Sequence, residues 1–250
     1  MNSNSKHSNR IKTELFLLAL ATILPLFTGC INPFRAIRPG PLRTETQSIE
    51  VQGATAARVE LEMGAGELTL GGGAGELAKA NFTYNVDAWK PIVSYTVTNG
   101  TGKLVIRQPD SIGVSASSAI RNDWDIHLNN TLPTDLKVQL GAGKSTLNLS
   151  SLVLSDLEVE CGAGETSVDL SGVWGKTTSV KISGGVGKLS VRLPKEIGVR
   201  VKTDTGIGET NATGLNKNGD VYTNAAYGSS PVTLNLDIEA GVGEIRLDVE

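Results

Sequence analysis

The sequence predicts an all-β protein, in which a stacked-strand β-solenoid follows an irregular antiparallel N-terminal β cap. Three observations support this fold class. The chain of 250 residues contains 29 glycines and only 4 % aromatic residues. Apolar and polar residues alternate over many short segments, a pattern that indicates half-buried strands. A Gly-x-Gly motif followed by Glu or Lys recurs along the chain, and such recurrence is typical of solenoid coils.

The glycine motif returns at nearly constant intervals in the second half of the chain. From Gly143 to Gly208 the second glycines of successive motifs are separated by 21, 23 and 21 residues. Apolar residues alternate with polar ones on both sides of each motif, as in residues 136–140 and 147–149. Because alternate residues of a strand share a face, each coil is predicted to be strand, glycine corner and strand, with one face inward. Cys161 falls in the inward set, which predicts a structural role for it.

The residue after each corner is predicted to point outward and to alternate in charge from coil to coil. If consecutive coils pair in register, these side chains are separated by roughly 4.8 Å, and opposite charges at that spacing form a cross-strand ladder of salt bridges. A row of metal-binding acids is the alternative, which the interleaved lysines oppose. The predicted ladder consists of Lys144, Glu165, Lys188 and Glu209.

One interval is longer than a coil. The second glycines of the last two motifs, Gly208 and Gly243, are 35 residues apart. The extra residues, 216–222, include an Asn-Gly pair, which favours a hairpin turn. This segment is predicted to leave the stack and to offer Tyr222 and Tyr227 as contacts for a partner, with a simple spacer as the alternative.

Residues 46–130 are predicted to form the N-terminal cap, and residues 131–250 the solenoid, which is continuous with the cap. The alternating segments of the cap are less regular than the coils. The turns around Lys90-Pro91 and around residues 99–102 are short enough to join antiparallel neighbours. Such a cap would cover the open edge of the first coil.

The first thirty residues predict export and lipid anchoring. Residues 1–29 have a basic start and an apolar run of thirteen residues, 15–27, which is too short to span a bilayer and indicates a signal peptide. The residues before Cys30 resemble the lipobox of bacterial lipoproteins, in which the cysteine is acylated and becomes the first residue. Residues 30–45 would then form a lipidated tether, and the protein would be an extracytoplasmic, membrane-anchored lipoprotein. Ordinary secretion with an incidental cysteine is the alternative.

Two ligand classes are excluded by the sequence pattern. The stretch from Gly141 to Lys144 is similar to part of a phosphate-binding loop. That motif, however, needs glycine where Val138 stands and a helix where the pattern predicts a strand, so no nucleotide is predicted. A formal net charge of −3 gives no indication of nucleic acid as a partner.

No enzymatic activity, metal site or cofactor is predicted. His127 is the one histidine outside the predicted signal peptide, and it lies beside Asp125 on the polar face of a predicted strand. Serine-type catalysis needs a base, and zinc needs three or four ligands, so a single histidine supports neither. The alternative is a β-helix-type carbohydrate-active enzyme that cleaves wall polysaccharide with a pair of carboxylates. The acids available for it are Asp123, Asp125, Glu158, Glu160, Asp169 and Asp204.

Several segments resemble the bacterial toast-rack family. They are WDIHL at 124–128, LP at 132–133, LKVQLGAG at 136–143, LSSL at 149–152 and LEV at 157–159. The stretch VRLPKEIGVR at 191–200 is similar to the related LiaF-like C-terminal group, and a more distant likeness extends to the group named "putative adhesin". The resemblance covers residues 45–250. It implies a rack of short strands outside the membrane, in envelope proteins sometimes linked to stress sensing, and supplies no catalytic residues.

These observations predict a non-catalytic binding or scaffold module at the bacterial cell envelope, with a role in adhesion or envelope stress. Its expected partners are the membrane, through the lipidated Cys30, and an envelope protein or glycan. The sequence does not indicate an oligomeric state.

Overall fold

The computed structural model describes residues 39–110 and 119–250, which belong to one compact unit, Ala36–Glu250. These residues form a 13-stranded β-sheet, and the short 3-10 helix η1 (Asp87–Trp89) is the helix found among them. In chain order the strands are β1 (Arg43–Ile49), β2 (Ala56–Ala74), β3 (Ala78–Tyr84), β4 (Ile92–Thr98), β5 (Thr101–Arg107), β6 (Asn122–Asn129), β7 (Thr134–Asn148), β8 (Leu154–Asp169), β9 (Thr178–Leu193), β10 (Gly198–Thr213), β11 (Asn216–Asn218), β12 (Val221–Thr223) and β13 (Thr233–Val249).

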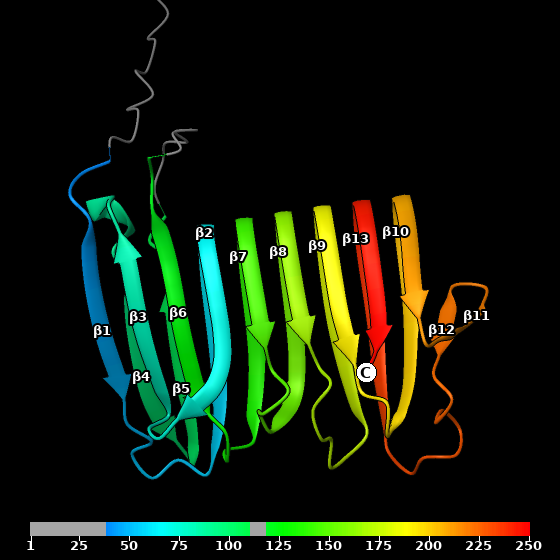
Figure 1. Ribbon diagram of the computed structural model, residues 1–250. Coiled ribbons are helices and arrows are strands. Elements are labelled where there is room, and N and C mark those ends of the chain that lie inside the picture. Colours follow the sequence, from blue (N-terminus) through cyan, green and yellow to red (C-terminus); the bar gives the residue numbers. More distant parts are fainter. Residues whose placement is uncertain (1–38, 111–118) are drawn as a thin grey trace, which may run out of the picture. The chain divides into compact units, whose positions relative to one another are not determined.

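The strands lie side by side in the order β1-β3-β6-β2-β7-β8-β9-β13-β10-β12-β11 (Figure 1). A short branch extends from β2, because β5 pairs with the first part of β2 and β4 pairs with β5. From β2 to β10 the neighbours are parallel, as expected for successive coils of one solenoid. The all-β, stacked-strand fold class is therefore confirmed.

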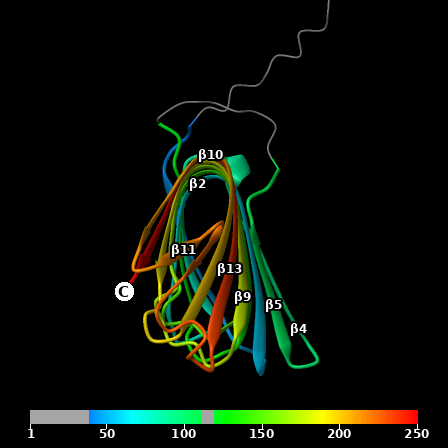
Figure 2. The ribbon, with the colours of Figure 1, turned by 90° about the vertical axis from the view of Figure 1, so that its right-hand side faces the viewer.

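Each of the six long strands bends near its middle, so that the sheet folds over into two limbs (Figure 2). The first limb precedes the glycine corner and the second follows it. The corners align across the rack, since Gly143 is in register with Gly66 on one side and with Gly164 on the other. We call these six strands, β2, β7, β8, β9, β13 and β10, the rack.

The core lies between the two limbs. Along β7, Leu136 and Val138 of the first limb and Leu147 of the second are at most 2 % exposed, and the polar residues between them face outward. At the N-terminal end Trp124 packs edge-on against Phe82, with ring centroids 5.5 Å apart. The alternation of apolar and polar residues that predicted the strands is thus the alternation between core and solvent.

The C-terminal strand is not the last strand of the rack. β13 lies between β9 and β10 and is parallel to both, whereas the sequence order predicted β10 beside β9. The inward residues explain this arrangement. In the second limb of β13 they are Ile245 and Leu247, both buried, but in β10 they are Thr210 and Ala212. A strand with large apolar residues on both limbs suits an inner position, and one whose second limb has only small or polar inward residues suits the end.

The boundary of the cap also differs from the prediction. β2 lies within residues 46–130, yet its corner is in register with that of β7, so the rack begins at β2. The cap consists of β1, β3 and β6 with the β4–β5 branch. The turn at residues 99–102 joins antiparallel neighbours as predicted, but the turn at Lys90-Pro91 does not, because β3 pairs with β1 and β6.

Candidate binding surfaces

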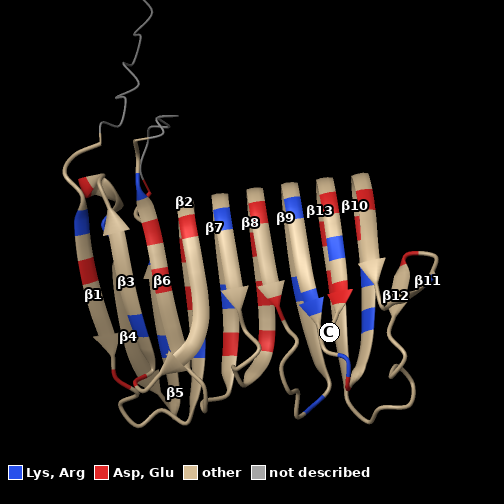
Figure 3. Cartoon of the chain, in the orientation of Figure 1, with Lys and Arg blue, Asp and Glu red and all other residues tan. Residues whose placement is uncertain are grey.

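The outer surface of the rack carries rows of charged residues. In the row near the corners that Figure 3 shows, acidic and basic residues alternate from β2 to β13, and β10 again carries an acid. The most regular row lies on the first limb, four residues before the first glycine of each corner. In spatial order its members are Glu60, Lys137, Glu158, Lys181, Asp237 and Lys202, each in register with the next. Opposite charges alternate through all six positions, and this row was not among the predicted sites.

Lys137 has the best-defined ion pairs of this row. Its ammonium lies 3.0 Å from Glu158 and 3.0 Å from Glu160, which is two residues further along β8. Hydrogen bonds first to Glu160 and then to Glu158 raise the pKa of Lys137. Because each of these side chains is about one-third exposed, the pairs serve register more than they add to the free energy of unfolding.

The predicted ladder after the corners is in register for three of its four members. Lys144 is in register with Glu165, and Glu165 with Lys188. Beyond them, the neighbour of Lys188 is Glu244 at 3.6 Å, and Glu209 is in register with Glu244. The prediction that Glu209 follows Lys188 was therefore wrong, because β13 separates the two strands.

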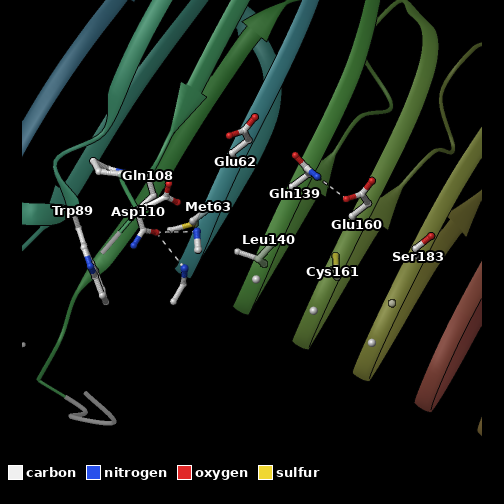
Figure 4. A pocket seen from close by; sticks show the side chains of 17 residues that line it. Glu62, Met63, Trp89, Gln108, Asp110, Gln139, Leu140, Glu160, Cys161 and Ser183 are labelled. Carbon is white, nitrogen blue, oxygen red and sulfur yellow. Dashed lines mark hydrogen bonds between the residues drawn. The ribbon is translucent and has the colours of Figure 1, made fainter. Parts of the chain in front are cut away.

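A groove runs across the outer ends of the first limbs, beside the corners. It encloses about 920 Å³. Figure 4 shows Glu62, Gln139, Glu160 and Ser183 on neighbouring strands, with Trp89 and Asp110 at one end. The glycines beside the groove are needed for the close stacking of the strands. A Cβ atom on Gly141, for example, would lie 2.3 Å from the carbonyl oxygen of Gly64.

Hydrogen bonds hold the end of the groove at the cap. The side-chain oxygen of Gln108 accepts hydrogen bonds from the backbone N–H groups of Gly64 and Ala65, at 2.9 and 3.2 Å. The amide of Asn122 donates to the carbonyl of Ala65 at 2.7 Å, and the indole N–H of Trp124 donates to Asn122 at 3.1 Å. The corner of β2 is thus fixed to the cap, and these hydrogen bonds hold the groove wall in place at that end.

The polar groups in the middle of the groove already have partners. Gln139 donates a hydrogen bond to Glu160 at 2.6 Å, and this bond, followed by that from Lys137, lowers the pKa of Glu160. The carboxylate is therefore held charged. It is suited to accept hydrogen bonds from a bound hydroxyl, amide or ammonium group.

The two predicted tyrosine contacts have different environments. Tyr222 on β12 is 3 % exposed, because its ring covers the end of the core beside the first limb of β10, and the ammonium of Lys217 lies 5.3 Å from the ring centroid. It closes the core and has no free face for a partner. Tyr227 follows β12 and is 44 % exposed, so it remains a candidate contact.

Cys161 and His127 both have structural surroundings. Thr166 donates a hydrogen bond to the sulfur of Cys161 at 3.1 Å, and burial raises the pKa of that thiol. His127 contacts the carbonyl oxygen of Gly72 at 2.9 Å through Nδ1 and Asp125 at 3.3 Å through Nε2. Within the described ranges, no cluster of three or more His, Cys, Asp or Glu side chains is arranged to hold a metal ion.

Four of the six acids considered for glycan cleavage, Asp123, Glu158, Glu160 and Asp169, are paired with lysine or arginine. Glu158 and Glu160 share Lys137, Asp169 faces Arg192 at 3.6 Å, and Asp123 bonds to Arg121. A general acid of a glycosidase needs a raised pKa, whereas that of Glu160 is lowered. These contacts suit a charged structural surface.

The predicted lipidation site, Cys30, lies outside the described residues. Across residues 39–110 and 119–250, the structure contains no helix with the length and apolar character needed to cross a membrane.

The fold and surfaces described above define a class of protein: an open, all-β rack of parallel bent strands with charged outer faces. Residues 38–192 match the family model described as "N-terminal domain of toast_rack", and residues 142–247 match the model described as "Cell wall-active antibiotics response LiaF, C-terminal". The first match spans more than half of the chain, and the chain belongs to the toast-rack family.

Solved structures include a relative of nearly the same extent. A "putative cell adhesion protein" from Clostridium sporogenes is 35 % identical, with a TM-score of 0.78, over 84 % of this chain and 100 % of that one. A "putative adhesin" from Bacteroides fragilis is 13 % identical over 83 % of this chain and 97 % of that one, with a TM-score of 0.33. Comparison with curated proteins gave no match.

Proposed function

We propose that this protein is a non-catalytic binding or scaffold module of the bacterial cell envelope, held outside the cytoplasm by lipid on Cys30 and acting in adhesion. The observation that carries the proposal is the Clostridium sporogenes relative, which is named for cell adhesion and matches over its whole length at 35 % identity. The match of residues 142–247 to a domain named for a response to cell-wall-active antibiotics supports the envelope as the location and favours envelope stress as a second role.

The groove is the candidate ligand site of this module. Strands held in register form the walls of the groove, and hydrogen bonds to the cap hold one end of it. The site is therefore formed before a ligand binds. It presents the carboxylates of Glu62 and Glu160 and the amide of Gln139, and the largely buried Trp89 lines one end. Such a mixture of polar groups along an open groove suits an extended envelope glycan or peptide.

Cross-linking in intact cells followed by mass spectrometry tests the anchor and the binding role together. The native chain is compared with Cys30→Ser, and incorporation of an alkyne-labelled fatty acid is measured in both. We expect labelling of the native chain alone and a specific envelope partner that is lost with the anchor. An unlabelled native chain would contradict the lipid anchor. A labelled chain that captures neither protein nor glycan would contradict the binding role.

The enzyme alternative has its own test. The purified chain is incubated with wall polysaccharide, and released reducing ends are measured. We expect no release above a buffer control. Release that disappears in Glu158→Gln or Asp169→Asn, while circular dichroism shows the native fold, would replace the binding module with a carbohydrate-active enzyme.

The groove is tested by the double variant Gln139→Ala/Glu160→Ala. Its matched control is Ser167→Ala/Ser190→Ala, at outward positions of the second limb. We expect partner capture to fall in the groove variant and to persist in the control. Equal capture by both variants would place the ligand elsewhere on the rack.

A further inference from the structure

The second limb of β10 has an open edge. On one side β10 pairs with β13 along its whole length, from Gly198 to Thr213. On the other side, β12 covers only Arg200 to Lys202. Among the described strands none pairs with the far side of residues 206–213, and seven of these eight residues are exposed, Thr210 being partly buried. A row of backbone donors and acceptors is therefore available to another strand.

The same edge ends an apolar line along the corners. The residue between the two glycines of each corner is Ala65, Ala142, Ala163, Val186, Val242 and Ile207 in spatial order. The side chains become larger toward β10, where Ile207 is 72 % exposed and Val242 44 %. An aliphatic side chain on an added strand would cover Ile207 in the same way that each residue of the line flanks the next.

Charge alternation fails at this edge. Asp204 is in register with Glu239, and Glu209 with Glu244, so acids face acids on both sides of the Val242–Ile207 pair. Like charges in register are unfavourable, and for these four residues the recorded ion pair is that of Glu244 with Lys188. In the row of Glu209 the earlier acids are each followed by a lysine on the next strand, Glu67 by Lys144 and Glu165 by Lys188. The row of Asp204 contains no lysine, and its earlier acids are followed by uncharged residues.

We propose that the second limb of β10 binds an extended basic segment of a partner protein, which adds to the rack as its next strand. The segment places an aliphatic side chain beside Ile207 and a lysine or arginine beside Glu209, with backbone hydrogen bonds along residues 207–213. A second copy of the chain fits less well, because Asp204–Thr213 contains two acids and no lysine or arginine, so that two such edges repel each other. The inference rests on the proposed role as a binding module and names a partner class for it.

The probe is a blocked eight-residue peptide of alternating lysine and valine, added at low salt to the purified full-length chain. Two control peptides separate charge from strand formation: one replaces lysine with glutamate, and the other replaces valine with proline, which keeps the charge but removes backbone donors. We expect only the lysine–valine peptide to bind. The chemical shifts of the protein's backbone amides that change on its addition should belong to residues 205–213. Equal binding of the proline peptide, or shifts centred elsewhere, would overturn the proposal.

Variants of the exposed acids test the contact without affecting the core. Asp204→Asn/Glu209→Gln should weaken peptide binding about fivefold, the effect of losing two exposed charge pairs. The charge-matched control Glu50→Gln/Asp156→Asn should leave affinity unchanged. Sedimentation could instead show that the native chain is a dimer and that Ile207→Lys dissociates it. That result would show that the edge binds a second copy of the chain and would overturn the proposal of a basic partner. If the native chain captures its partner on cells but does not bind the peptide, this inference alone is overturned. If the native chain shows neither partner capture nor lipid labelling, the proposed function is overturned.

Discussion

Gly164 shows how closely the coils approach each other at the scale of one residue. Its φ of +135° lies in a region that favours glycine, and a Cβ atom at this position would lie 1.9 Å from the carbonyl oxygen of Gly143 on the next strand. The corner therefore has neither the backbone freedom nor the space for a side chain. The same constraint explains why the motif returns at every corner.

Gly164→Ala should destabilise the protein by about 3 kcal/mol or more, since strain at positive φ and overpacking each cost about 1–3 kcal/mol. The control is Gly175→Ala, because nothing lies within 4 Å of a Cβ atom added there. Urea denaturation followed by circular dichroism measures both variants. A Gly164→Ala variant as stable as the native chain would show that the coils are further apart than described.

Two surface carboxyl groups link stability to pH. The hydroxyl of Tyr84 at 2.6 Å and then Lys90 at 2.9 Å lower the pKa of Glu45 below its ordinary value of 4.5, and Gln139 and Lys137 do the same for Glu160. Where the folded pKa is lower, the unfolded chain binds more protons, so their contribution is present above about pH 4.5 and is lost as pH falls through the folded pKa.

Glu45→Gln/Glu160→Gln should therefore make the free energy of unfolding less dependent on pH below about 4.5. The control is Glu50→Gln/Glu196→Gln, which removes the same formal charge. Urea midpoints at four pH values measure the difference. If both variants keep the slope of the native chain, the two hydrogen-bonded carboxylates do not contribute to acid unfolding.

At the scale of a strand, the charge rows fix which residue of one coil faces which residue of the next. A shift of one residue would exchange the inner and outer faces, and a shift of two would bring glycine corners against side chains. Lys188 lies in register between Glu165 and Glu244. Its charge is thus part of the pattern that selects the native alignment.

Lys188→Glu should lower the free energy of unfolding by about 1 kcal/mol at low salt, because four consecutive strands then carry an acid in this row. Most of the loss should disappear at 1 M salt, where the Debye length is about 3 Å. The control is Lys195→Glu, at an exposed residue for which the described structure records no ion pair. Thermal unfolding at both salt concentrations measures the effect, and a loss that persists at 1 M salt would indicate a packing role instead.

The coils and their corners could be predicted because each one repeats the same local chemistry: alternating apolar residues and a glycine pair. The strand order could not be obtained from that repeat, since every coil satisfies it equally well. A signal for the order did exist in residues 60, 137, 158, 181, 202 and 237. In chain order the last three are Lys181, Lys202 and Asp237, and their charges alternate only if β13 lies between β9 and β10.

The candidate site was less predictable than the fold. The groove combines rack residues such as Gln139 and Glu160 with Trp89 and Asp110, which are separated from them in the sequence and meet them only through the cap. In the sequence, Tyr222 lies in a polar segment with a second tyrosine nearby, which is typical of a loop that contacts a partner. In the structure its ring covers the end of the core and is buried. Both outcomes depend on long-range packing, which local patterns do not specify.

For the whole rack, the inserted position of β13 can be tested with disulfides. Val242 and Ile207 are in register on neighbouring strands, where Cα atoms are about 5 Å apart, whereas Val186 and Ile207 are separated by β13 and by about 10 Å. Disulfides require Cα atoms closer than about 7 Å. In a chain whose natural cysteines are serine, Val242→Cys/Ile207→Cys should oxidise readily and Val186→Cys/Ile207→Cys should not. The reverse result would show that β10 lies beside β9, as the order of the strands in the sequence predicts.

The inserted strand also ties the integrity of the molecule to its last residues. During synthesis β10 and the β11–β12 hairpin are made before β13, but they have no place beside β9 until β13 arrives between them. A chain that stops near residue 232 would therefore lack the strand that joins β10 to the rest of the rack. Loss of an ordinary edge strand, by contrast, would only shorten the sheet. The rack can be completed only after β13 has been made, so that a product truncated before β13 exposes the unpaired edges of β9 and β10.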